Sequence, residues 1–528
     1  MNFELSLKNH WLDILIAILS LIFCVLAFFN VVIPMDVFAW DQSHHNLYGT
    51  WIANDIQSGN WDLFWNHTHR QTLWPFLQSW ILGIFFIIFG ISYVSARACH
   101  LIIFFFLLLA TWQVGKALDE QRGKLIGGFS WGLMIISPYL WALGTNVMIE
   151  VIAALITIYI FYSLLKLAKT DKWIWILPAG ILMALMIVVK YNFAITIYLS
   201  VILWALYEFA LNKGQLLNKA TRTKFTNLFF IKYFLIFLPS ILMFFWWMFG
   251  TNSKNKWAMV WYSRSEWVAK AHQVPGFLNN SIYYFKHLIV SYNEWFPVMG
   301  IIILIGFIGS LFLLRKRNIP TILLVFFTWG TMPIHIWVLM NKLPRYIYNI
   351  IPLIYMAAVI FWLSMWDILK EKIGDKKAKI ITISATALLA TIMIIQSGPM
   401  FNYFSGRANK VVGERYMDVL DYINPKIPPN APIVCGSEMV KLSPYTFDFH
   451  FRHHIRNRTA EVYNKFSLPY VKFTRGMYLV AYMEDPTPEK MEKDEWYKFI
   501  NLNKKNLQKI DSKFFTKLNL RVDIYLTK

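Results

Sequence analysis

Acidic and histidine side chains gather in one polar stretch, residues 35–97, which follows the first long apolar run. Asp36 and Asp41 come just after that run, and the pair His44-His45 begins three residues after Asp41. A carboxylate within hydrogen-bond reach of a hydroxyl group can take its proton. The stretch is also rich in tryptophan, which is typical of a membrane interface. An interfacial belt with solvated acids explains the tryptophans but does not explain the clustered acids and histidines.

The same side chains are of the types that bind a divalent metal ion. Their clustering in a loop lacks the helical spacing that makes a metal-binding motif recognisable. The sequence therefore assigns no metal ligand, and a divalent ion stays an open alternative for Asp41, His44, His45 and Glu150. The three cysteines are too few and too scattered to form a disulfide or zinc framework.

The composition places this polar stretch in a membrane protein. Of the 528 residues, 57% are hydrophobic and 15% are charged, whereas soluble proteins have about 25% charged residues. These values exclude a soluble globular enzyme and a disordered chain, and the count of three cysteines excludes a disulfide scaffold. The net charge of +21 fits basic cytoplasmic loops that meet membrane lipids, and we expect no nucleic-acid partner.

Eleven apolar runs are long enough to cross the bilayer at about 1.5 Å per residue. They fall near residues 11–34, 98–115, 125–143, 151–168, 173–189, 192–210, 233–250, 297–314, 320–340, 347–366 and 380–397. With these eleven spans, lysine and arginine collect in the loops of one side, which the positive-inside rule assigns to the cytoplasm. A twelfth run, 73–90, would invert every later loop if it crossed. We therefore predict that 73–90 lies in the outer interface, a depth that suits Trp74 and Trp80.

This topology leaves three regions on the outer side, which are 35–97, 251–296 and the tail. In the first, Asn46–Ser58 has apolar residues near helical spacing and predicts an amphipathic surface helix. The tail is predicted to be a small α/β domain. It has strand-like runs at Ala431–Cys435, Gly476–Tyr482 and Leu520–Leu526, and helix-like stretches near Arg415–Ile423 and Glu489–Ile510. The expected domains are thus 1–397, in the membrane, and 398–528, outside the cytoplasm.

Three basic residues fall at the outer ends of predicted helices: Arg97, Lys190 and Arg345. Cations at the outer ends of membrane helices can stabilise the phosphate group of a substrate. Their long side chains can equally extend to the phosphates of ordinary lipids. Glu150 opens a helix on the same side, where the helix dipole favours an acid. A structural role and a substrate-binding role both remain open for these four residues.

Several short motifs, taken in order along the chain, resemble those of glycosyltransferase family 39 in the GT-C superfamily. This group includes protein O-mannosyltransferases and the aminoarabinose transferases of lipid A. The motifs are Asp41-Gln42-Ser43-His44-His45, Trp74-Pro75-Phe76, Gly90-Ile91-Ser92-Tyr93-Val94-Ser95-Ala96-Arg97, Met148-Ile149-Glu150, Val189-Lys190-Tyr191 and Pro344-Arg345-Tyr346. The chain departs from the family at Gln42, where a second acid is common. The resemblance covers residues 1–397, and the tail resembles only the variable outer domains of such enzymes.

The resemblance implies a GT-C type α-helical polytopic protein, with about eleven spans, an interface helix and the α/β tail, in the bacterial inner membrane. It implies transfer of a hexose or pentose from a polyprenyl-phosphate donor to a hydroxyl group of a glycan, lipid or protein, with inversion at the anomeric carbon. Asp41 is the expected base, Asp36 is the alternative, and capping of a helix is the competing role for Asp41. The expected substrate-binding residues are Asp36, His44, His45, Arg97, Glu150, Lys190 and Arg345.

A transporter or flippase for a lipid-linked saccharide is the alternative function. It predicts ionisable residues near the middle of the membrane, often in helices broken by glycine or proline. The ionisable residues described above fall at the outer ends of the spans instead, which favours chemistry at the membrane surface.

Overall fold

The computed structural model describes residues 3–212, 219–260, 274–316, 318–339, 342–407, 414–436, 442–455, 462–464 and 475–528. Residues 261–273, in the second predicted outer region, are among those outside the described part of the chain. The chain divides into two compact units. The first contains Met1–Phe28, Trp65–Gln78 and His100–Ser405, and the second contains Phe29–Phe64, Ser79–Cys99 and Gly406–Lys528.

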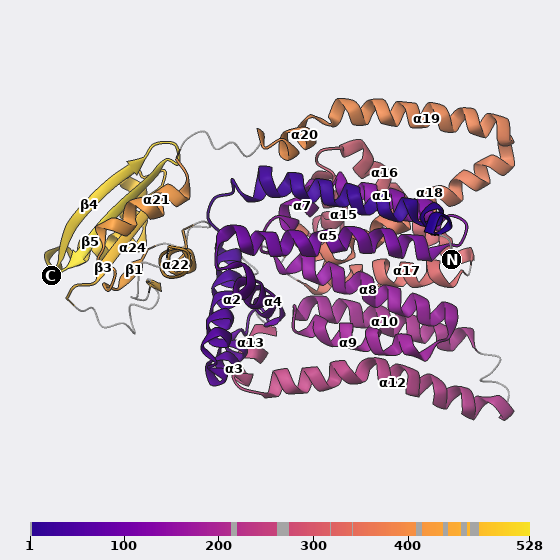
Figure 1. The fold of residues 1–528 in the computed structure, drawn as a ribbon, viewed down its shortest axis with the longest axis horizontal. Helices are drawn as coiled ribbons and strands as arrows, with labels where there is room; N and C mark the ends of the chain where they lie inside the picture. The colour runs from indigo at the N-terminus through magenta and orange to yellow at the C-terminus, as the bar shows by residue number, and fades with distance from the viewer. Residues whose placement is uncertain are drawn as a thin grey trace. The chain divides into compact units, whose positions relative to one another are not determined.

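The first unit is built of helices (Figure 1). They are α1 (Phe3–Ala27), most of α5 (Tyr93–Leu118), α6 (Gly123–Ile135), α7 (Pro138–Gly144), α8 (Ile149–Thr170), α9 (Ile176–Ile187), α10 (Tyr191–Leu211), α12 (Lys219–Phe249), α13 (Ser253–Val260), α15 (Phe277–Val290), α16 (Pro297–Gly309), α17 (Ile319–Trp329), α18 (Ile351–Ile373), α19 (Asp375–Gln396) and α20 (Gly398–Phe404). Shorter helical turns are η2 (Trp173–Trp175), η4 (Ser310–Lys316), η5 (Ile334–Val338) and η6 (Pro344–Ile350).

Within the described residues, nine helices are long and apolar enough to cross a membrane, so the chain is a multi-pass membrane protein. A tenth segment is the pair α6 and α7, which is bent by 72° where Pro138 opens α7. An eleventh is the shorter apolar helix Trp173–Ile187, whose α9 packs against α8, α10 and α12. These eleven segments correspond one to one with the predicted runs, and the predicted fold class is confirmed.

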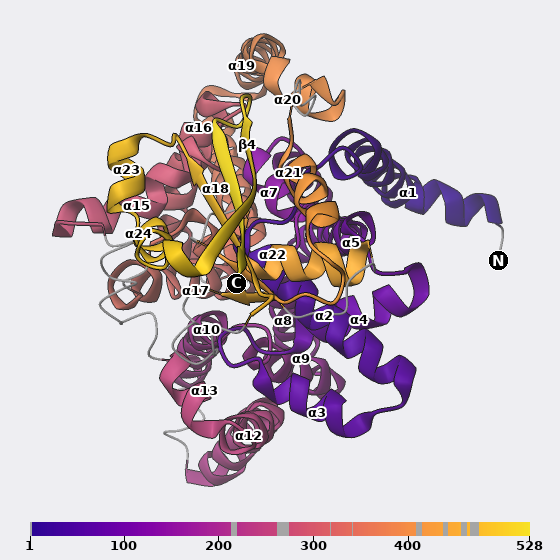
Figure 2. The same ribbon diagram turned by 90° about the vertical axis from the view of Figure 1, so that its left-hand side faces the viewer.

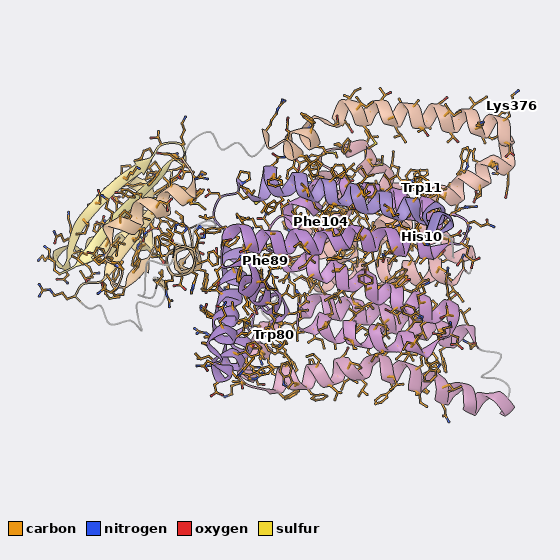
Figure 3. All side chains as sticks on the ribbon, in the orientation of Figure 1. His10, Trp11, Trp80, Phe89, Phe104 and Lys376 are labelled. Carbon is orange, nitrogen blue, oxygen red and sulfur yellow. The ribbon has the colours of Figure 1, made fainter. Side chains whose placement is uncertain are left out.

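The surface of the first unit is apolar over long stretches, as hydrocarbon contact requires. Trp11 on α1 is 54% exposed, whereas Phe104 on α5 is fully buried (Figure 3). Ile395 on α19 is 76% exposed. Exposed apolar area of this extent is rare on soluble monomers and marks contact with a membrane or a partner.

Helices α2 (Trp40–Ser58) and α4 (Leu77–Phe89), most of which belong to the second unit, cross closely at two glycines. A Cβ atom added at Gly49 would lie 2.7 Å from Leu82 Cβ, and one at Gly83 would lie 2.7 Å from Ile52 Cγ2. The structure thus pairs α4, a shorter apolar helix of 13 residues, with a helix of the first outer loop. That 73–90 does not cross the membrane stays a prediction.

The predicted start of the loop helix at Asn46 is wrong, because α2 begins at Trp40. The hydroxyl of buried Ser43 lies 2.8 Å from that of Thr446, and it also donates to the carbonyl oxygen of Ala39. The first turn of α2 therefore packs against helix α22 (Pro444–Asp448) of the tail. Contact with a distant segment, rather than apolar periodicity, determines where this helix begins.

The tail forms a five-stranded mixed sheet with the strand order β2-β1-β3-β5-β4. Figure 1 labels β1, β3, β4 and β5 of this sheet, and Figure 2 shows the molecule turned by 90°. The strands are β1 (Ile433–Cys435), β2 (Val462–Asn464), β3 (Tyr478–Glu484), β4 (Leu507–Phe515) and β5 (Leu520–Thr527). β1 runs parallel to β2 and β3, and β5 runs antiparallel to β3 and β4. The helices that accompany the sheet are α21 (Tyr416–Ile423), α22, α23 (Pro488–Lys493) and α24 (Glu495–Leu502). Trp496 and Tyr497 of α24 pack on Leu479 and Ala481 of β3 in the core of the sheet.

The predicted helix over Glu489–Ile510 is correct only as far as Leu502, since β4 begins at Leu507. β4 is an edge strand, and most of its side chains are exposed. Edge strands often carry charged residues that oppose aggregation. The charged residues Lys509, Asp511 and Lys513 give this segment the polar composition of an exposed helix. Pairing with β5 makes it a strand.

The placement of α4 predicts how cysteines introduced on either side of this helix will react with a thiol reagent. Arg70→Cys and Ser92→Cys should both react with a membrane-impermeant thiol reagent added from the outer side, because Arg70 is exposed and Ser92 is half-exposed. Background labelling should be low, since Cys24, Cys99 and Cys435 are all buried. Labelling at only one of the two new cysteines would mean that α4 crosses the membrane.

Candidate active site

Asp41 lies in the first turn of α2, where the helix dipole stabilises a carboxylate. The preceding Ala39 is extended, with φ −72° and ψ 166°, and the helix starts directly after it. Because α2 begins at Trp40, Asp41, His44 and His45 stand at positions i, i+3 and i+4 of one helix and share a face. The structure thus places in one helical turn three residues that the sequence assigned to a loop.

The two histidines differ in their surroundings. His44 packs between the rings of Tyr48 and Tyr445, each with its centroid 4.4 Å from that of His44. His45 is 4% exposed. Tyr445 comes from α22, so the tail completes the surroundings of the first-loop helix within the second unit.

Asp36 is held by the backbone of helix α21. Its two carboxylate oxygens accept hydrogen bonds from the N–H groups of Tyr416 and Met417, each at 2.9 Å, and Oδ1 also accepts from Val37 at 2.8 Å. N–H groups at a helix start have no partner within the helix, and a carboxylate is well suited to satisfy them. This geometry gives Asp36 a capping role that joins the first loop to the tail.

This capping role makes a prediction about stability. Asp36→Ala should lower the free energy of unfolding by about 1–2 kcal/mol, the usual loss for a helix cap, and Asp36→Asn should lose less because one acceptor oxygen remains. Thermal unfolding of the purified variants checks this, with Asp62→Ala, at an exposed acid in the first turn of α3 (Trp61–Arg70), as the matched control. A melting temperature for Asp36→Ala equal to that of the wild type would contradict the capping role.

Arg97 is only 2% exposed, although it opens a predicted membrane span. Its Nη2 donates to the main-chain oxygen of Asp36 at 2.6 Å, and its guanidinium lies 4.7 Å from the ring centroid of Phe38. Its Nε and Nη1 have no hydrogen-bond partner among the described residues. Arg97 therefore supports the turn that carries Asp36, and two of its nitrogens remain available to an anion.

Glu150, Lys190 and Arg345 meet within the first unit. Lys190 Nζ lies 2.9 Å from Glu150 Oε1, and Arg345 Nε lies 3.7 Å from the same oxygen. Each residue sits at the start of a helix, with Glu150 in the first turn of α8, Lys190 directly before α10 and Arg345 in η6. Spans that begin on one side of the membrane bring their first residues to one level.

This triad is buried and carries more positive than negative charge. Glu150 is fully buried, Lys190 is 8% exposed, and the Arg345 side chain is 19% exposed. The Lys190 ammonium also lies 4.7 Å from the ring centroid of Tyr346. The triad itself consists of two cations and one carboxylate, and fixed cations can stabilise a phosphate group.

Lys256 and His69 form a pair of basic residues in the first unit, and the sequence did not predict their contact. Lys256 is fully buried, its Nζ donates to the main-chain oxygen of Trp247 at 2.8 Å, and it lies 2.9 Å from His69 Nδ1. The His69 ring stacks on that of Trp247. Burial lowers the pKa of Lys256 to about 8, and burial together with the Lys256 charge lowers the pKa of His69. The sequence signal was the mixture of cations and aromatic residues in the outer region 251–296.

The lowered pKa of Lys256 predicts a pH dependence of stability. Between about pH 8 and the ordinary lysine pKa near 10.5, the folded chain has lost the Lys256 proton while the unfolded chain retains it. The unfolded state then binds more protons, so stability rises with pH in this window. The melting temperature of the wild type minus that of Lys256→Met should therefore increase from pH 8 to pH 10. A difference that stays constant or falls would show that Lys256 titrates normally.

Within the described residues, no group of three or more His, Cys, Asp and Glu side chains has a geometry that could hold a metal ion. The candidates Asp41, His44 and His45 belong to the second unit, whereas Glu150 belongs to the first. The described part of the chain thus presents no metal site of its own, and no chemical step is assigned to a metal.

The site residues predicted from the sequence thus fall into two groups. Asp36, Asp41, His44, His45 and Arg97 belong to the second unit, and Glu150, Lys190 and Arg345 belong to the first. Within the second unit, residues of the first outer loop contact residues of the tail. Within the first, three residues far apart in sequence form one ion cluster.

No family model matches the sequence, and no curated protein matches it. Solved structures with the same fold do exist. ArnT from Cupriavidus metallidurans bound to undecaprenyl phosphate is 13% identical, covers 97% of both chains and has a TM-score of 0.60. The same protein in the apo state is 14% identical, covers 98% of both chains and has a TM-score of 0.62.

The archaeal oligosaccharyltransferase AglB from Archaeoglobus fulgidus, in complex with an inhibitory peptide and a dolichol-phosphate, is similar over a shorter part of its own length. The match is 12% identical with a TM-score of 0.54, and it covers 99% of this chain and 75% of the other. Both neighbours belong to the GT-C superfamily. At these identities the likeness establishes the fold, and the chain has the GT-C fold.

Proposed function

We propose that this GT-C fold chain is a membrane glycosyltransferase that moves a sugar from a polyprenyl-phosphate donor to an acceptor hydroxyl group. Two structural neighbours were solved with lipid phosphates, undecaprenyl phosphate in ArnT and dolichol-phosphate in AglB. The resemblance of the motifs around Asp41 and Arg345 to family 39 supports the same chemistry.

The observation that carries the proposal is the buried triad of Glu150, Lys190 and Arg345. A sugar joined to a lipid through a phosphodiester carries one negative charge, which Lys190 and Arg345 are proposed to contact. When the sugar leaves, the phosphate becomes a monoester with a charge of about −1.5 to −2 at pH 7. Cations fixed at this position then stabilise the transition state more than the ground state.

Asp41 is the proposed base. It takes the proton of the acceptor hydroxyl while that oxygen attacks the anomeric carbon, and the bond between the anomeric carbon and the phosphate oxygen breaks. The bonding electrons go to the phosphate. A single displacement of this kind inverts the anomeric centre. His44, His45 and Arg97 are proposed to bind substrate beside Asp41, and Asp36 is proposed to hold the first loop in place.

The proposal includes a location and partners. The chain acts in the bacterial inner membrane, with residues 1–397 as the transmembrane catalytic domain and residues 398–528 outside the cytoplasm. Its partners are membrane lipids, a polyprenyl phosphate that carries the hexose or pentose to be transferred, and an acceptor in an envelope glycan, lipid or protein. The charge distribution in the predicted loops supports this orientation.

Deletion of the gene tests the proposal in the cell. The deletion strain should accumulate a lipid-linked sugar, and mass spectrometry of its envelope glycans, lipids and proteins should find one sugar missing. Wild-type protein should restore both, and Asp41→Asn should restore neither. Unchanged lipid-linked sugars and an unchanged envelope in the deletion strain would refute the proposal.

One observation favours the alternative, a transporter for a lipid-linked saccharide. The α6–α7 segment is broken by 72° at Pro138, and broken helices are common in transporters. A transporter moves the intact donor, whereas a transferase cleaves it. Release of free polyprenyl phosphate from the donor therefore distinguishes the two functions.

A further inference from the structure

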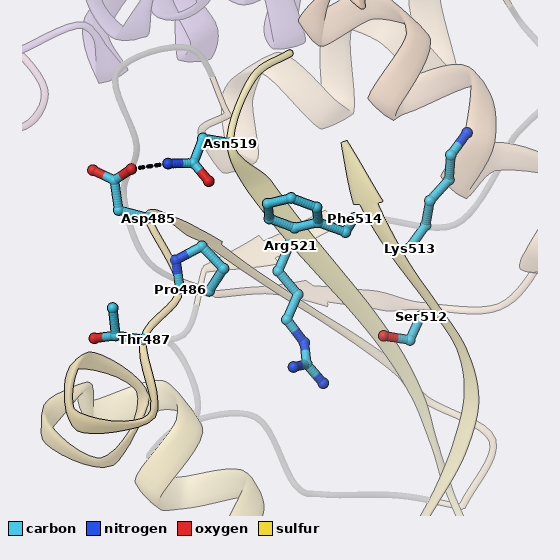
Figure 4. Close-up of a pocket in the computed structure, with 8 residues that line it drawn as sticks. All are labelled: Asp485, Pro486, Thr487, Ser512, Lys513, Phe514, Asn519 and Arg521. Carbon is cyan, nitrogen blue, oxygen red and sulfur yellow. Dashed lines mark hydrogen bonds between the residues drawn. The ribbon is translucent and has the colours of Figure 1, made fainter. Parts of the chain in front are cut away.

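A groove of about 720 Å³ lies on the tail sheet where β4 and β5 meet the turn that leads from β3 into α23 (Figure 4). Its walls include Phe514 of β4, Arg521 of β5 and the turn Asp485–Thr487. None of these residues takes part in the proposed transfer reaction.

The strand register brings an aromatic and a charged side chain of this groove to one face of the sheet. Phe514 pairs directly with Arg521, and Ser512 pairs with Asp523. Directly paired residues of neighbouring strands lie on the same face. A bulge between Lys509 and Asp511 shifts the alternation, so that Lys509 also reaches this face.

Buried Asp523 pairs with two cations, of which Arg521 lines the groove. Arg521 Nε donates to its Oδ2 at 2.9 Å, and Lys509 Nζ lies 2.7 Å from its Oδ1. Ser512 and Tyr497 donate to the same carboxylate. The charged residues that line the groove are Lys513, Arg521 and Asp485. Arg521 Nη1 has no hydrogen-bond partner within the described part of the chain.

The opposite wall of the groove is a fixed polar turn. The side-chain amide of Asn519 donates to the Asp485 carboxylate, and the Asp485 N–H donates to the Asn519 carbonyl oxygen at 2.9 Å. Both residues have positive φ, 47° for Asp485 and 48° for Asn519. Left-handed backbone is uncommon outside glycine, and the paired hydrogen bonds maintain it here. Across from this turn, the Phe514 ring is 46% exposed.

We propose that this groove binds a saccharide that carries an acidic substituent. The C–H face of the sugar ring packs on Phe514, its hydroxyl groups bond to Asp485 and Asn519, and its carboxylate or phosphate pairs with Arg521. A guanidinium fork suits either anion. An exposed ring beside a few convergent polar groups is the usual composition of a ligand site. The groove thereby gives the tail a binding function that is independent of the transfer reaction.

Isothermal titration of the full-length protein in detergent tests this inference with four probes: tetragalacturonate, maltotetraose, glucose 6-phosphate and inorganic phosphate. An acidic saccharide should bind at least about tenfold more tightly than maltotetraose. Phe514→Ala should weaken its binding about tenfold, the size expected for loss of one ring contact, and Arg521→Gln should remove the preference for acid. Leu502→Ala, at an 86% exposed apolar residue of α24, is the matched control and should bind like the wild type.

The outcomes are distinct. Preference for tetragalacturonate identifies a carboxylate ligand and preference for glucose 6-phosphate identifies a phosphate ligand, and both support the inference if Phe514→Ala weakens them. Binding of inorganic phosphate as tightly as of either saccharide would overturn it. So would the absence of binding by any probe, or binding that Phe514→Ala leaves unchanged while its melting temperature matches that of the wild type.

Discussion

Asp41→Asn should fold and insert normally yet transfer sugar about 10²–10⁴ times more slowly than the wild type, the usual contribution of a general base. The amide keeps the size of the side chain and one acceptor oxygen in the first turn of α2, but it cannot take a proton. Initial rates with a defined lipid-linked donor, measured on purified protein, check this expectation.

The matched control for this variant is Asp62→Asn, at an exposed acid in the first turn of α3. It removes the same charge from the same helical position and should retain wild-type turnover. Asp36→Asn should affect stability more than rate, because its carboxylate caps α21. Wild-type transfer by Asp41→Asn, together with an inactive but folded Asp36→Asn, would reverse the assignment of the base.

Arg345→Ala should lower kcat and also weaken donor binding. Its cation is proposed to face a phosphate whose negative charge grows as the sugar leaves, so the loss is greater in the transition state than in the ground state. We expect a fall in kcat of about 10²-fold or more, by analogy with other losses of one charge-stabilising group. Arg345→Lys should recover only part of the rate, because the bidentate guanidinium fork is lost.

Arg122→Ala provides the comparison for Arg345→Ala. Arg122 is also an arginine beside a span, and it pairs with Asp367 away from the triad. Its removal should leave kcat and KM unchanged. If Arg345→Ala behaved in the same way and lost only some stability, then Arg345 would serve to contact lipid phosphates and would not belong to the site.

The membrane spans were predictable from the sequence because run length and loop charge largely determine them. The run 125–143 shows the limit of this reasoning. It was expected to be one span, and the structure bends it by 72° at Pro138. Hydropathy averages over a window, whereas a proline acts at one peptide bond by removing its N–H.

Contacts between distant parts of the chain could not be predicted. The sequence placed Glu150 and Lys190 at helix ends, and only the fold brings them to 2.9 Å across an interval of 40 positions. The capping of α21 by Asp36 spans 380 positions, and no local pattern encodes it. β4 was mistaken for helix for the same reason, since its partner strand alone makes it a strand.

The most direct test of the central claim follows the fate of the lipid donor. Lipid-linked sugar extracted from the deletion strain is incorporated into vesicles that contain purified protein and an extract of the acceptor material, and the lipids are measured by mass spectrometry. We expect wild-type protein to convert the donor to free polyprenyl phosphate, and Asp41→Asn to leave it intact. Donor that stays intact with wild-type protein, or that only changes leaflet, would contradict a glycosyltransferase.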